Sequence, residues 1–164
     1  MSRWTTRLLA LVGVLAALGA IALAAGSGAL YWQHVESAAA KRTSDTLPAL
    51  ATEQIPVIFG YDYQTVERSL TDAYVLLTPD YRHEFEDRAT KDIIPQARER
   101  QVISQASVVG VGILEAQRDS GSVMVYMNRT VTDKSKQPAY DGSRLKVDYR
   151  KIDGKWLISY ITPI

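Results

Sequence analysis

The stretch from Leu8 to Trp32, which contains no charged side chain, constrains this chain more than any other feature of its sequence. As an α-helix these 25 residues would extend about 37 Å, which is more than the ~30 Å hydrocarbon core of a bilayer. The sequence therefore predicts a transmembrane helix over residues 8–32. The remainder of the 164 residues is enough for one domain at most.

The residues that flank this stretch predict its orientation. Two arginines and the terminal amine precede it, whereas His34 and Glu36 follow it, so the positive-inside rule places residues 1–7 in the cytoplasm. We expect a single-pass protein of the cell membrane whose C-terminal domain lies on the periplasmic side. A cleaved signal peptide is the alternative, because Ala22-Leu23-Ala24 has the small-x-small form of a cleavage site. The apolar stretch is longer than a usual signal core, which favours a retained anchor.

Small residues recur every four positions within the predicted span. Such a stripe lets a second membrane helix approach closely, although about half of the span is Ala, Gly or Ser and composition alone produces the same spacing. The predicted helix-contact residues are Ala16, Ala20, Ala24 and Gly28.

The charge balance and the cysteine count exclude several functions. Without the first 36 residues, which contain Arg3, Arg7 and Glu36, the 19 basic and 18 acidic residues fall to 17 of each. A neutral domain argues against nucleic acid as a partner. There is no cysteine, so disulfides, thiolate metal sites and cysteine nucleophiles are impossible.

After the span the pattern is helical. Residues 33–60 are predicted to form a juxtamembrane helical stalk that packs on the domain, kinked or segmented by Pro48 and Pro56. Asp62 is predicted to cap a following helix. Thr78-Pro79-Asp80 predicts the start of another helix, which Pro95 ends or bends. The expected buried positions of these helices are Val35, Ala39, Thr43, Leu47, Leu50, Val66, Leu70, Ala73, Tyr74, Leu77, Tyr81, Phe85, Ala89 and Ile93.

After Arg100 the pattern changes to strands. Alternating apolar residues predict four of them, with Gly110 and Gly112 at bulges or bends in the first and a two-residue turn at Asp153-Gly154 before the last. Helices followed by a strand meander indicate the α+β class. We therefore expect residues 61–164 to form an extracytoplasmic domain, with helices packed on a curved antiparallel four-stranded sheet that encloses a cone-shaped cavity.

Few residues could support catalysis in such a cavity. The chemistry needs a base with a shifted pKa near an oxyanion-stabilising donor, and the nearby combinations are Asp62 with Tyr61 or Tyr63, and His83 with Tyr81. A helix cap is the better interpretation of Asp62, and a solvated helix face that of His83. We therefore predict that the protein is not an enzyme, and assign no catalytic, cofactor-binding or metal-binding residue.

The last strand is the candidate partner surface of the domain. Trp156, Ile158 and Tyr160 are predicted on one face and Leu157 and Ile161 on the other, so both faces are apolar and both should be covered. The helices cover one face. The other is predicted to meet the stalk, a second copy or a partner through Trp156, Ile158 and Tyr160.

Four stretches of the sequence resemble a known family. They are GYDYQTVERSL (60–70), VVGVGILEA (108–116), MNRTVTD (127–133) and RLKVDYRKIDGKWLISYITPI (144–164). Together with the N-terminal span they resemble the Mce-associated membrane proteins of mycobacteria and related actinobacteria. The final hairpin is also similar to that of many cone-shaped domains of the nuclear transport factor 2-like superfamily.

The resemblance implies a non-enzymatic accessory or scaffold subunit that assembles or stabilises an Mce (mammalian cell entry) lipid import complex. It implies a permease or Mce proteins as partners, contact with the lipid bilayer, and no cofactor. One alternative is a lipid-binding or isomerase-like enzyme that uses the cone cavity. Another is a secretion-system assembly subunit, because one span and a cone-shaped periplasmic domain also occur in an inner-membrane subunit of type IV secretion systems.

Overall fold

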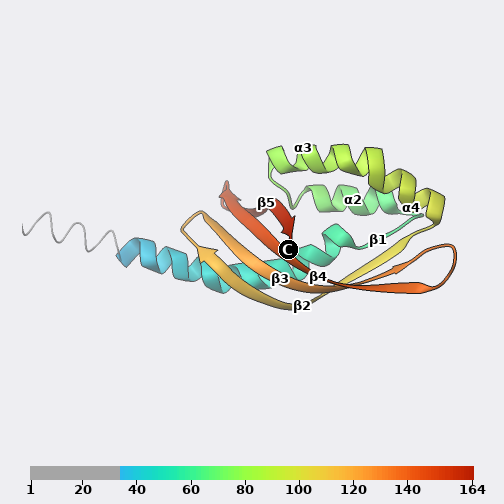
Figure 1. The fold of residues 1–164 in the computed structure, drawn as a ribbon. Coiled ribbons are helices and arrows are strands. Elements are labelled where there is room, and N and C mark those ends of the chain that lie inside the picture. The colour runs from blue at the N-terminus through green and yellow to red at the C-terminus, as the bar shows by residue number, and fades with distance from the viewer. Residues whose placement is uncertain (1–33) are drawn as a thin grey trace, which may run out of the picture. The chain divides into compact units, whose positions relative to one another are not determined.

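The computed structural model of the chain describes residues 34–164 (Figure 1). The chain divides into two units, Met1–Ala39 and Ala40–Ile164, and the second contains all of the sheet. The predicted membrane helix (8–32), the small-residue stripe at Ala16, Ala20, Ala24 and Gly28, and the predicted cytoplasmic residues 1–7 lie outside the described residues. Within residues 34–164, no helix is both long enough and apolar enough to span a bilayer.

Residues 34–59 are helical, and from residue 40 onward one side of this helix is buried. Pro48 and Pro56 do not divide it into separate helices, because the side chains beside them are packed in the core. A proline inside a helix costs about 3 kcal/mol, whereas each fully buried Leu or Ile contributes about 1.5–3 kcal/mol. The burial of several such side chains therefore contributes more stability than each proline costs. The buried residues are Thr43, Leu47, Ala51, Ile55 and Ile58.

The segment after this helix differs from the prediction. Gly60 ends the helix by donating its N–H to the Pro56 carbonyl at 2.8 Å. Tyr61–Asp62 then form a two-residue strand, β1. Asp62 does not cap α2 (Val66–Tyr74), because its Oδ1 accepts the N–H of Gln64 at 2.8 Å and closes a turn before the helix starts.

The next helical segment starts where the sequence predicts. Thr78 is extended (ψ 155°) and Pro79 opens α3 (Pro79–Arg88), as expected for a proline in the first turn. Pro95 does not end the helical path, since a π-helical segment, η1 (Ala89–Ile93), leads directly into α4 (Ile94–Arg100). The Ile94 N–H bonds to the Ala89 carbonyl, and such a widened turn lets a helix continue past an irregular position.

The strands form a five-stranded sheet in the order β1-β2-β3-β4-β5, with every neighbouring pair antiparallel. The prediction of four strands omitted β1, which is too short to show a period of its own. At the last hairpin, Asp153 (φ 49°) and Gly154 (φ 78°) form the predicted two-residue turn. The four long strands are β2 (Ile103–Ala116), β3 (Ser120–Thr132), β4 (Pro138–Ile152) and β5 (Lys155–Pro163).

One face of the sheet, the inner face, packs against the helices. The α2, α3 and α4 helices lie together on one side of the sheet (Figure 1). The register aligns Ile113, Val123, Val147 and Ile161 across the four long strands, and the last three of these side chains are buried. This hydrophobic core confirms the α+β class with helices on one side of an open antiparallel sheet.

Candidate functional site

The predicted contact surface on β5 is interrupted by a bulge. Ile158 pairs with Tyr149 but Tyr160 pairs with Asp148, so Ser159 is an extra residue and Ile158 and Tyr160 do not share a face. Ile158 is 0 % exposed within this chain's own core. The predicted common face of Trp156, Ile158 and Tyr160 is therefore wrong in its geometry. Contact with a partner through Trp156 and Tyr160 stays a prediction.

Tyr160 packs against α3. Its ring lies 5.2 Å from that of Tyr81, at an interplanar angle of 54°. Burial raises the pKa of Tyr81, so this phenol remains neutral. Tyr160 thus joins the last strand to the helical layer and stays 46 % exposed.

The opposite side of the sheet, the outer face, is open over β2 and β3. A Cβ atom built at Gly110 or Gly112 would have no neighbour within 4 Å. Tyr126 pairs with Gly110 and is 48 % exposed, although Val125 and Met127 beside it are buried in the core. No helix of the described residues therefore covers this part of the outer face.

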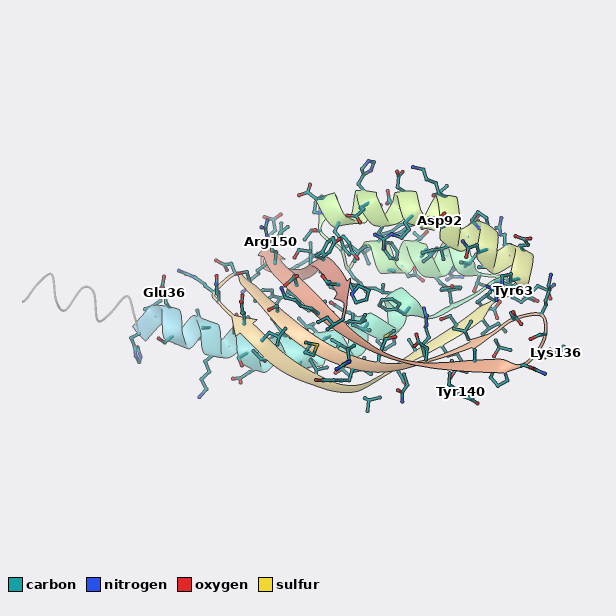
Figure 2. All side chains as sticks on the ribbon, in the orientation of Figure 1. Glu36, Tyr63, Asp92, Lys136, Tyr140 and Arg150 are labelled. Carbon is teal, nitrogen blue, oxygen red and sulfur yellow. The ribbon has the colours of Figure 1, made fainter. Side chains whose placement is uncertain are left out.

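The open area continues onto β4 and along the edge of β2. Tyr140 is 81 % exposed and projects away from the helical side that carries Asp92 (Figure 2). β1 pairs only with Ile103 and Ser104, so the rest of the β2 edge has no partner strand among the described residues. Bulges at Val109 and Leu114 leave both of these side chains exposed on that strand. The extra residues are not Gly110 and Gly112, where a bulge or bend was predicted, because both glycines pair in register with Tyr126 and Met124.

The residue pairs considered for catalysis do not assemble. Asp62 is used in the turn before α2. His83 is exposed whereas Tyr81 is buried, so the two occupy opposite sides of α3. No group of three metal-binding side chains occurs in the part of the chain that the structure describes.

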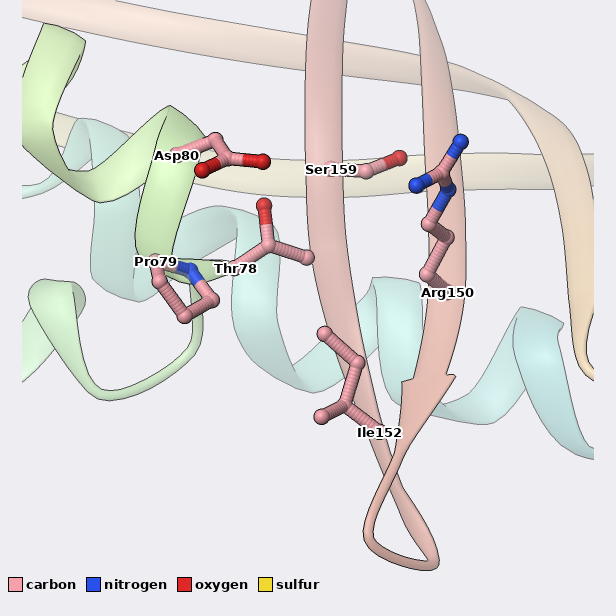
Figure 3. A pocket seen from close by; sticks show the side chains of 6 residues that line it. All are labelled: Thr78, Pro79, Asp80, Arg150, Ile152 and Ser159. Carbon is pink, nitrogen blue, oxygen red and sulfur yellow. The ribbon is translucent and has the colours of Figure 1, made fainter.

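A polar cleft of about 420 Å³ lies at the start of α3. Thr78 and Asp80 line it from the helix, and Arg150 and Ser159 line it from the strands (Figure 3). The Ser159 hydroxyl donates to the Asp148 carbonyl at 3.1 Å, so its proton is held by a backbone acceptor. Asp80 and Arg150 carry opposite charges, and the cleft therefore has no net preference for an ion of either sign.

A second cavity, of about 200 Å³, lies between the inner face and the helices η1 and α4. Tyr61, Arg100 and Arg129 are among the residues with hydrogen-bond donors that line it. The sequence reasoning missed this site, since the three residues are far apart in the chain. The available signal was Arg129, a charged residue in the inward register of a strand whose other inward residues include Val125 and Met127.

Solved structures of similar fold include a type IV secretion system protein. The periplasmic domain of DotI matches with a TM-score of 0.63 at 11% identity, over 73% of this chain and 94% of that one. An IcmL-like type IV secretion system protein from Legionella pneumophila matches with a TM-score of 0.62 at 10% identity, over 73% and 92%. VirB8 of Agrobacterium tumefaciens matches at 0.54 and 12%, over 68% and 85%. At these identities the likeness shows the fold.

Similarity in sequence leads to mycobacteria, although no family model matches the chain. Uncharacterized protein Rv1362c of Mycobacterium tuberculosis is 25% identical over 143 residues, which are 84% of this chain and 65% of that protein. Outer membrane protein Rv1973 of the same species is 30% identical over 147 residues, which are 88% of this chain and 91% of the relative. Neither name mentions Mce systems, so the Mce association stays a prediction. The chain belongs to the family of the mycobacterial Outer membrane protein Rv1973.

Proposed function

We propose that the protein is a non-enzymatic assembly subunit of a transport complex in the cell envelope. The observation that carries this proposal is the open outer face, where Gly110, Gly112 and Tyr126 lie without a covering layer of the described chain. A sheet face without a covering layer leaves room for another protein to pack against it. Aromatic side chains such as Tyr126 and Tyr140 are enriched in interfaces, because each offers a large area at a low entropic cost.

The comparisons support a secretion-system role more than a role in an Mce lipid importer. The fold is similar to the periplasmic domains of type IV secretion components, which supports an assembly subunit of the secretion-system type. A role specific to an Mce lipid importer, with a permease or Mce proteins as partners, has only the sequence resemblance behind it. The relative named as an outer membrane protein supports a location in the envelope, without deciding whether the chain spans the inner membrane once.

The enzyme alternative has less support. In the described residues the two candidate pairs, Asp62 with Tyr61 or Tyr63 and His83 with Tyr81, are engaged elsewhere or point apart. General acid-base catalysis requires both groups within hydrogen-bond reach of one substrate. A surface that binds another protein explains the open sheet, whereas a reaction in the cone does not.

The test is affinity purification of the tagged full chain from native membranes in mild detergent. We expect a subunit of an envelope transport complex to co-purify with the parent chain. Tyr126→Lys should lose it, because a charge in the centre of the contact would be desolvated without a partner. Val75→Lys is the matched control, since Val75 is 68 % exposed between α2 and α3, away from the outer face. Retention by Tyr126→Lys, or no transport subunit with the parent chain, would refute the proposal.

A further inference from the structure

The polar cleft at the start of α3 contains two side chains of opposite charge that do not neutralise each other. Asp80 lines it from the helix and Arg150 from β4, and Figure 3 shows Thr78 and Ser159 between them. Both charged side chains are exposed, and neither forms an ion pair with another described residue. Each of them is therefore available to a group of opposite charge in a molecule that enters the cleft.

The Thr78 hydroxyl is an unpaired polar group in the same cleft. Thr78 precedes α3 at the position where a threonine side chain normally accepts a hydrogen bond from the first turn, but it makes no such bond. The residue is 5 % exposed, and its hydroxyl has no partner among the described residues. Unlike the hydroxyls of Ser122 and Tyr149, it is not completely enclosed, so a molecule in the cleft can reach it.

Oxygen acceptors from three residues line the cleft. Asp80 contributes a carboxylate and Thr78 a hydroxyl. Ser159 contributes a hydroxyl whose proton is donated to a backbone carbonyl, so its lone pairs remain as acceptors. A primary ammonium group has three N–H donors, one for each of these residues. Arg150 has only donors, and its guanidinium suits a carboxylate.

The charge balance and the volume of the cleft limit the ligand. A cation alone would be repelled by Arg150 and an anion alone by Asp80, whereas a zwitterion is attracted by both. Pro79 and Ile152 add apolar surface. The volume of about 420 Å³ lies near the lower end of the roughly 300–1,000 Å³ of small-molecule sites. The cleft therefore suits a small zwitterion with a short apolar part.

We propose that this cleft binds a free amino acid with a short apolar side chain. Its ammonium group donates hydrogen bonds to the three acceptor residues, and its carboxylate accepts hydrogen bonds from Arg150. Its side chain packs against Pro79 and Ile152. Tyr126 and the open glycines of the outer face do not line this cleft, so the site is independent of the proposed assembly role.

The experiment titrates the full chain in detergent with L-valine, with L-valinamide, which lacks the negative charge, and with isovalerate, which lacks the ammonium group. Calorimetry gives the affinity, and the methyl NMR signals of Thr78 and Ile152 report the location. We expect L-valine to bind saturably and to shift both signals. L-Valinamide and isovalerate should each bind at least about tenfold more weakly, because each loses the hydrogen bonds of one charged group.

Two charge variants assign the two ends of the ligand. In Arg150→Gln, L-valine should bind no more tightly than L-valinamide, and in Asp80→Asn it should bind no more tightly than isovalerate. Both side chains are exposed, so we expect both variants to fold. Thr78→Val removes a hydroxyl without changing the charge, and it should weaken L-valine binding several-fold.

The matched controls are Arg68→Gln and Asp72→Asn. They remove the same charges from exposed positions of α2 that do not line the cleft, so they should leave L-valine binding unchanged. The proposal is overturned if L-valine does not saturate, if either singly charged analogue binds as tightly, or if the two charge variants of the cleft bind L-valine like the parent.

Discussion

Gly121 lies where helix 34–59 crosses the start of β3, and replacing it by alanine should destabilise the fold. An added Cβ would lie 2.6 Å from Leu47 Cδ1 and 2.9 Å from the Glu115 carbonyl oxygen. Leu47 is 0 % exposed and the carbonyl is backbone, so neither atom can move aside without disturbing the core. Overpacking of this kind typically costs about 1–3 kcal/mol. Because two contacts fall below 3 Å, we expect the cost of Gly121→Ala to lie near the upper end of this range. That is a sizeable part of the ~5–15 kcal/mol free energy of unfolding of a typical domain.

The assay is urea unfolding of the full chain in detergent, followed by circular dichroism. Gly112→Ala is the matched control, because it is also a glycine in a strand but its Cβ would meet no atom within 4 Å. We expect this control to change stability by less than about 0.5 kcal/mol. Leu47→Ala alone should cost about 2–5 kcal/mol, but clearly less in the Gly121→Ala background, where it relieves the clash. If Gly121→Ala is as stable as the control, or the two substitutions are additive, the packing of this helix on the sheet is not as described.

Two further predictions concern single side chains. Hydrogen bonds from Ser135 and Arg100 lower the pKa of Asp133 to about 2. The stability that this carboxylate contributes is therefore complete above its unfolded pKa of about 4 and is lost as the pH falls toward 2. In Asp133→Asn the urea midpoint should depend less on pH between these two values, and a pH dependence equal to that of the parent would contradict this. The Tyr149 hydroxyl is buried without a partner among the described residues, so Tyr149→Phe should be neutral or stabilising in the same assay; a loss of more than about 1 kcal/mol would show that the hydroxyl is hydrogen-bonded.

Local signals in the sequence predicted the parts of the fold that local chemistry determines. The Thr78-Pro79-Asp80 start and the Asp153-Gly154 turn both depend on backbone preferences of a few adjacent residues, and both occur as expected. The effect of the prolines was not predictable in this way. Whether Pro48 interrupts a helix depends on the core contacts of its neighbours, which the sequence does not show.

The candidate sites depended on features without a local signature. The extra residue at Ser159 shifts the register of β5, and this places Ile158 in the core and Tyr160 against Tyr81. No periodicity in the sequence marks such a bulge. The small cavity brings Tyr61 of β1 next to Arg129 of β3, and only the sheet topology makes these residues neighbours.

The central claim, that the outer face of the sheet is the contact surface of an assembly subunit, is tested most directly by photo-crosslinking in intact cells. A photoreactive amino acid replaces Tyr126 on the outer face or, as a control, His83 on the exposed side of α3. We predict that the Tyr126 position forms a covalent adduct with the same transport-complex subunit that co-purifies with the parent chain, while the His83 position does not. An adduct to that subunit from the His83 position alone, or from neither position, would contradict the account.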